Sequence, residues 1–209
     1  MSTHRTSSWL WLATLLFAGC STATVTPRVR PGDTLVRPDR VLVHDFAVVP
    51  DEVAIKGGPD AQALGGAGAD VQTKEDIEVG QDFARALAEN LLRELRDRGI
   101  DCDKATAAPP PGPNTASIRG RFLRTRQSDR STLVGFGFRD GQVRTHIQIF
   151  QGTGVTLRLV AEAESTTESN LKPGLSPTTA AIVEADAKRT AVQVAEKIAD
   201  YYKRQGWIQ

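Results

Sequence analysis

Apolar residues recur along the chain with two different periods, which predict two long helices and several strands. Isoleucine, phenylalanine, alanine and leucine follow helical spacing between Thr73 and Gly99, with Thr73 placed as an N-cap and Gly99 as a C-terminal stop. The same spacing over about 179–204 predicts a second helix, which Gly206 ends.

Shorter segments carry the patterns typical of strands. The β-branched run Arg40–Val49 and the short segment Ile100–Lys104 each predict one strand. Ser117–Gln127 alternates between apolar and polar residues, and so do Val143–Phe150 and Val155–Ala163, which a glycine-containing turn joins into a predicted hairpin. These elements predict an α+β fold, with one mixed, mostly antiparallel sheet of about five strands and two long helices on one of its faces.

Alternation divides the side chains of these strands between two faces. The predicted core face is apolar and consists of Ile118, Phe122, Val143, Ile147, Ile149, Leu157, Leu159 and Ala161. The opposite face is polar and consists of Arg119, Arg121, Arg144, His146, Arg158, Glu162 and Glu164.

The four arginines on that polar face, Arg119, Arg121, Arg144 and Arg158, form a candidate binding face. Guanidinium groups bind carboxylates and phosphates in bidentate fashion, so aligned arginines suit an anionic partner. The alternative is a half-solvated sheet with no ligand, because neighbouring glutamates can neutralise the arginines locally.

The N-terminal segment has the pattern of a bacterial lipoprotein signal. His4 and Arg5 form a positive region, Trp9–Phe17 forms an apolar region, and FAGC, ending at Cys20, occupies the position of a lipobox. Cleavage would fall between Gly19 and Cys20, with thioether-linked lipid and palmitate on the cysteine. An uncleaved membrane span is the alternative, but the apolar run to the cysteine is 12 residues long, whereas a spanning helix needs about 20.

This signal sets the expected organisation of the chain. Residues 1–19 form the signal peptide, 20–38 a flexible tether rich in Thr, Arg and Pro, and 39–206 a single α/β periplasmic domain. Ser21 follows the lipidated residue where an aspartate would favour retention at the inner membrane in enterobacterial-type sorting. We therefore expect the domain to be lipid-anchored at the periplasmic face of the outer membrane, with the inner membrane as the alternative.

Charge and cysteine content narrow the choice of partners. Without residues 1–19 the 209-residue chain would retain 190 residues with 25 basic and 25 acidic side chains, a balance that argues against a nucleic-acid partner. If Cys20 carries lipid, Cys102 has no partner within the chain. It is then buried in the core or able to bridge two chains, and burial is the commoner fate of a free cysteine.

One carboxylate stands out as a candidate functional group. Asp45 interrupts an apolar strand, where an unpaired charge would be costly, so it either titrates or binds a ligand, or is satisfied by loop amides. His44, His146 and Cys102 stand apart on separate elements, so we expect no metal site. We likewise identify no catalytic residue set and no cofactor motif. The glycines of the GFG sequence at 135–137 favour a turn because a strand, not a helix, follows them.

The chain resembles a family of bacterial lipoproteins of unknown function. The resemblance rests on the strand RPDRVLVHDFAVVPDEV, the helix from Gly80, the segment LVGFGFRDG and the last helix, and it spans roughly Pro38–Tyr202. More distantly, the first strand and helix are similar to the periplasmic modules of CsgG-type, LpoB-type and TolB N-terminal domains. The resemblance implies a compact α/β envelope domain that acts through protein contacts.

Two functions from different classes follow from these observations. The first is a non-catalytic binding or assembly module, tethered through Cys20, that binds another envelope protein or a second copy of itself. The alternative is a periplasmic hydrolase or ligand carrier for cell-wall or lipid material, with Asp45 and the glycine-rich loop at 57–68 at its site.

Overall fold

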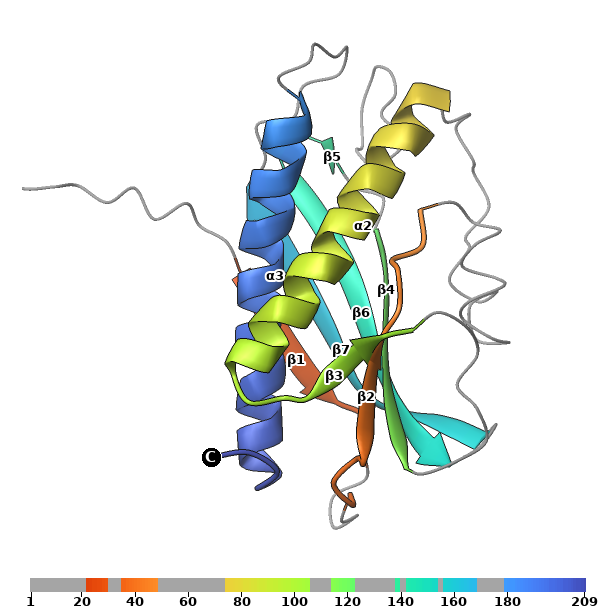
Figure 1. Cartoon of the computed structure of the whole chain (residues 1–209), viewed down its shortest axis with the longest axis vertical. Coiled ribbons are helices and arrows are strands. Elements are labelled where there is room, and N and C mark those ends of the chain that lie inside the picture. The colour runs from red at the N-terminus through yellow and green to blue at the C-terminus, as the bar shows by residue number, and fades with distance from the viewer. Residues whose placement is uncertain are drawn as a thin grey trace, which may run out of the picture.

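Two helices cover one face of a single twisted sheet, and within the residues that the structure describes no helix lies on the other face (Figure 1). The computed structural model describes residues 22–29, 35–48, 74–105, 114–122, 138–139, 142–153, 156–168 and 179–209. The predicted α+β class, with both helices on the same face, is confirmed.

Within the described ranges the sheet has seven strands, two more than we expected. They are β1 (Thr22–Pro27), β2 (Arg40–Val43), β3 (Cys102–Lys104), β4 (Thr115–Phe122), β5 (Phe138–Arg139), β6 (Gln142–Thr153) and β7 (Thr156–Glu168). Their spatial order is β1-β7-β6-β4-β2-β3, and β5 pairs with β6. Strand β2 runs parallel to β3 and β4, whereas every other described pair is antiparallel.

The two helices are α2 (Lys74–Asp97) and α3 (Thr179–Arg204). Beyond α2, Gly99 takes a φ of 79°, and beyond α3, Gly206 takes a φ of 71°. Glycine has no Cβ to clash in this left-handed region, which explains why each helix stops there. Helix α2 packs on β2 and β3, helix α3 packs on β7 and β1, and the helices pack on each other.

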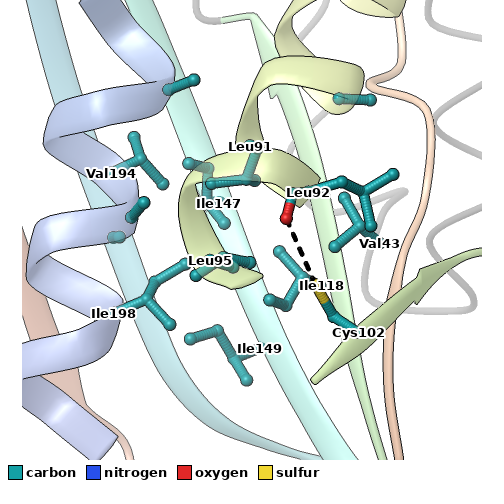
Figure 2. Close-up of a cluster of buried hydrophobic side chains, with 14 of the residues drawn as sticks. Val43, Leu91, Leu92, Leu95, Cys102, Ile118, Ile147, Ile149, Val194 and Ile198 are labelled. Atoms are coloured by element: carbon teal, nitrogen blue, oxygen red, sulfur yellow. Dashed lines mark hydrogen bonds between the residues drawn. The ribbon is translucent and has the colours of Figure 1, made fainter. Parts of the chain in front are cut away.

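The core lies between the helices and the sheet (Figure 2). Its side chains come from every layer: Val43, Leu91, Leu92, Leu95, Ile118, Ile147, Ile149, Val194 and Ile198 are all buried. Cys102 belongs to this cluster, as predicted, and its Sγ lies 3.6 Å from the Leu92 carbonyl oxygen. Burial raises the pKa of the Cys102 thiol to about 11, so this cysteine is poorly reactive in the folded chain.

A β-bulge changes which residues of β7 face the core. The register between β6 and β7 shifts at Ile149/Phe150, so β7 has one extra residue there. Val160 is therefore buried in the core, whereas Leu157 and Leu159 are only partly buried and lie outside it. The prediction that both leucines belong to the core face is wrong, because simple alternation does not anticipate the shift.

The segment that we expected to be a flexible tether contains strand β1. Thr22–Pro27 pairs with β7 over six residues, from Thr22 opposite Thr166 to Pro27 opposite Ala161. Further along, Asn114 Nδ2 donates to the Val36 and Arg37 carbonyls, and Leu35 joins the core. The tether prediction is wrong for these residues.

Several predicted features lie outside the described residues. They are the signal peptide with Gly19 and Cys20, the glycine-rich loop at 57–68, the N-cap Thr73, and the GFG sequence at 135–137. Among the residues that the structure does describe, no helix has the length and apolar character needed to cross a bilayer.

Candidate functional site

The sheet face away from the helices carries a cluster of polar and charged side chains. Strand β4 contributes Ser117, Arg119 and Arg121, because these alternate with the core residue Ile118. The neighbouring strands β6 and β7 contribute Arg144, His146, Gln148, Phe150, Glu162 and Glu164. We call this surface the arginine face; strand alternation predicts it correctly for Arg119, Arg121, Arg144, His146, Glu162 and Glu164.

Arg119 is held in place by its neighbours on β4 and β6. Its guanidinium carbon lies 5.3 Å from the centroid of the Phe150 ring, within the range of a cation–π contact. Its Nε donates to Ser117 Oγ at 3.3 Å, and Ser117 Oγ lies 2.8 Å from His44 Nε2. Partial burial lowers the pKa of Arg119, because its charge is partly removed from water.

Glu162 is the acidic centre of the arginine face. Arg28, just beyond β1, donates its Nε–H to Glu162 Oε2, and Gln148 Nε2 donates to Oε1 at 3.3 Å. His146 Nε2 lies 3.4 Å from the same Oε1 atom. Partial burial acts to raise the pKa of Glu162, but the hydrogen bonds from Arg28 and Gln148 outweigh it and lower that pKa.

His146 and Arg121 face each other across β6 and β4, and each keeps a buried polar atom without a hydrogen-bond partner. These atoms are His146 Nδ1 and Arg121 Nε, although His146 is only 7% exposed. Burial lowers the pKa of His146, and the charge of Arg121 lowers it further, so the ring is neutral at pH 7. Burial also lowers the pKa of Arg121. Buried polar atoms without a partner are costly in a fold, and a ligand or an ordered water at this position would satisfy them.

Arg158 does not belong to the arginine face, although we predicted it there. The bulge at Ile149/Phe150 turns this part of β7 over, and the charge of Arg158 acts on Tyr201 of α3. Arg158 therefore lies toward the helix layer. Arg144 remains on the arginine face and is exposed.

Asp45 takes no part in this cluster. Its Oδ1 lies 3.1 Å from Lys104 Nζ, and the two side chains are 44% and 36% exposed. Such a half-solvated ion pair contributes little to stability. Strand β2 ends at Val43, so Asp45 lies beyond it and meets Lys104 at the β3 edge. The role of Asp45 as a functional carboxylate stays a prediction.

Three participants in the site have no signal in the sequence. Arg28 lies in the predicted tether, and Ser117 and Phe150 are ordinary strand residues in any pattern. Only the strand register brings them there: the β1–β7 pairing places Arg28 near Glu162, and the β4–β6 pairing places Ser117 and Phe150 beside Arg119. Within the described ranges, no three His, Cys, Asp or Glu side chains lie close enough together to hold a metal ion, and the absence of a metal or other cofactor stays a prediction.

Comparison with known proteins identifies a family but no characterised function. The family model "Domain of unknown function (DUF4410)" matches residues 41–185. No curated protein matches the chain.

Two solved structures show remote likeness. A PelC dodecamer from Paraburkholderia phytofirmans is 16% identical, with a TM-score of 0.34, and the match covers 83% of this chain and 98% of that one. A protein from Xanthomonas campestris, of the family DUF330, is 12% identical, with a TM-score of 0.39, and the match covers 90% of this chain and 98% of that one. At these identities and TM-scores the likeness says nothing about function.

Proposed function

Because the chain belongs to the DUF4410 family, a domain of unknown function, we propose its role from its own residues: a lipid-anchored, non-catalytic envelope module that binds an anionic surface of another envelope protein, or of a second copy, through the arginine face. Cys20 carries the lipid, and the domain lies at the periplasmic side of the outer membrane. As part of this proposal, the first strand and helix are distantly related to CsgG-type, LpoB-type and TolB N-terminal domains.

The observation that carries the proposal is that two buried atoms on neighbouring strands, Arg121 Nε and His146 Nδ1, have no hydrogen-bond partner. Two guanidinium groups, Arg119 and Arg121, are partly desolvated side by side on β4, and Glu162 beside them already accepts hydrogen bonds from Arg28 and Gln148. A carboxylate supplied from outside would accept from Arg121 Nε. Nδ1 of the neutral His146, whose Nε2 lies beside Glu162, would instead accept from an O–H or N–H group of the partner.

Cross-linking in living cells tests the binding role. The wild-type protein is compared with the double variant Arg119→Gln/Arg121→Gln, and the matched control Arg85→Gln/Arg93→Gln removes two exposed arginines from α2. Detergent extraction, native sizing and mass spectrometry then identify what remains attached. We expect one stoichiometric partner, or one assembly of this chain, with the wild type and the control but not with the β4 variant; equal capture by all three would reject the proposal.

The hydrolase alternative is favoured by one contact, the 2.8 Å separation of Ser117 Oγ and His44 Nε2. A histidine base beside a serine can activate it as a nucleophile. Ser117, however, is 0% exposed, and its Oγ already accepts a hydrogen bond from Arg119. A fluorophosphonate probe distinguishes the two functions. Labelling that the Ser117→Ala variant abolishes would establish the hydrolase; no labelling of the folded protein supports the binding module.

A further inference from the structure

We infer that β1 fixes the domain beside the bilayer that carries its lipid, so that the arginine face meets a partner at that same membrane surface. This inference rests on the proposed lipidation of Cys20. It goes further because it sets the reach of the domain, which a flexible tether would leave open.

Strand β1 is bound to the domain along its whole length. It pairs with β7 from Thr22 to Pro27, and Val25 packs against the core. Immediately after it, the Arg28 amide donates to the Val160 carbonyl at 2.9 Å, and the Arg28 side chain pairs with Glu162. Residues 22–28 are therefore part of the fold, and they end at the arginine face.

The pairing of β1 limits the distance between the lipidated Cys20 and the arginine face. Cys20 precedes Thr22 by two residues, which span at most about 7 Å. From Thr22 to Arg28 the strand advances roughly 20 Å, so Arg28 and its partner Glu162 lie within about 27 Å of the lipidated residue. If β1 were detached, the next core residue would be Leu35, and the 15 residues from Cys20 could extend to about 50 Å.

The reach of the domain from its anchor, about 27 Å with β1 paired or about 50 Å with β1 detached, limits which partners it can contact. A domain held within about 27 Å of its anchor reaches proteins that are embedded in, or lie against, the same bilayer. A domain on a long tether could reach structures deeper in the periplasm. Because the arginine face lies at the end of β1, the partner we propose is a protein at the membrane surface that presents acidic side chains there.

The hydrogen-bond direction along β1 identifies variants that detach it. Amide groups alternate in direction along a strand, and since Arg28 donates to β7, the amides of Thr24 and Thr26 also point toward β7. Proline at these positions removes both donors. Pro27, which lacks a donor, occupies the alternate position, where none is needed.

The distance is measured on the lipidated, full-length protein in liposomes by energy transfer to acceptor lipids. A donor dye is attached at Glu89→Cys on α2 or at Val36→Cys, which is 73% exposed in the wild type. Cys102 stays unlabelled because it is buried. The compared variants are Thr24→Pro/Thr26→Pro, the matched control Thr24→Val/Thr26→Val, and a 12-residue Gly-Ser insertion between Ser21 and Thr22.

We expect the wild type and the valine control to show the same short distance of closest approach. The proline variant and the insertion should both lie farther out, the insertion by about 20 Å. A wild-type distance equal to that of the insertion variant would overturn the inference, and this comparison holds even if the proline variant does not fold. Mass spectrometry of Cys20 distinguishes failure of the proposed function from failure of this inference. If Cys20 carries no lipid, both the lipid-anchored module and the role of β1 are rejected. If Cys20 carries lipid but the wild-type domain lies far from the bilayer, only the role of β1 is rejected.

Discussion

Gly120 shows how single positions constrain the core beside the arginine face. A Cβ built on Gly120 would lie 2.0 Å from Cε1 of Phe46, whose ring packs near Phe122 with centroids 6.2 Å apart. Phe122 in turn meets Phe83 of α2 edge-on at 5.4 Å. The glycine on β4 therefore makes room for an aromatic cluster that connects the sheet with the helix layer.

We predict that Gly120→Ala destabilises the domain by about 1–3 kcal/mol, because the added methyl forces Phe46 out of its position. Urea unfolding followed by circular dichroism measures the change. As a control, Ala116→Gly on the same strand removes a methyl without creating a clash. An unchanged midpoint for Gly120→Ala would show that Phe46 is not packed against β4.

His146 gives the domain a specific dependence on pH. Burial and Arg121 hold its pKa below the ordinary value of 6.5. As the pH falls below that value the unfolded chain takes up a proton that the folded chain does not, so stability falls. Above pH 6.5 the histidine is neutral in both the folded and the unfolded chain, so it does not make the stability depend on pH.

We therefore predict that His146→Gln reduces the loss of stability between pH 7 and pH 5. The amide of glutamine still reaches toward Glu162 but does not titrate. Glu162 has a pKa below its ordinary 4.5, so its own contribution falls at lower pH and does not obscure the comparison. Parallel slopes for the two proteins over this interval would contradict the neutral, buried state of His146.

At the level of whole elements, periodicity predicts what is regular and fails where register changes. Both helices and the strands β2, β3, β4, β6 and β7 follow from spacing, because one face of each is packed and apolar. The bulge in β7 has no periodic signal, and it moves Arg158 toward the helix layer. Strand β1 is not predicted, because its Thr-rich sequence at a sheet edge resembles a linker.

Strand β1 is expected to contribute to folding. A chain that starts at Leu35 loses the pairing with β7, the Val25 contact and the Arg28–Glu162 ion pair. We predict a lower urea midpoint for it than for a chain that starts at Ser21, together with aggregation through the uncovered β7 edge. Equal midpoints and equal solubility would mean that residues 22–29 act as a tether after all.

For the molecule as a whole, the proposed lipid anchor determines where the arginine face can bind a partner. We predict that Cys20→Ser moves the protein from the membrane fraction, or stops its processing at Gly19–Cys20, since the thiol is the proposed site of lipid attachment. Cell fractionation with metabolic palmitate labelling measures both effects. A processed, membrane-resident Cys20→Ser protein would show that another feature holds it there.

The site itself could be only partly anticipated. Alternation placed Arg119, Arg121 and His146 on one face correctly, because β4 and β6 are regular where those residues lie. The contacts that define the site, His44 with Ser117 and Arg28 with Glu162, join residues 73 and 134 positions apart. Strand order brings such residues together, and no local pattern reports strand order.

The most direct measurement is site-specific photo-cross-linking in living cells. A photoreactive residue replaces the exposed Arg144 on the arginine face, or the exposed Glu89 on the far side of the helix layer. We predict one specific membrane-associated partner, or a homo-oligomer, captured from position 144 and not from position 89. Capture from neither position, or the same products from both, would contradict the arginine face as the binding surface.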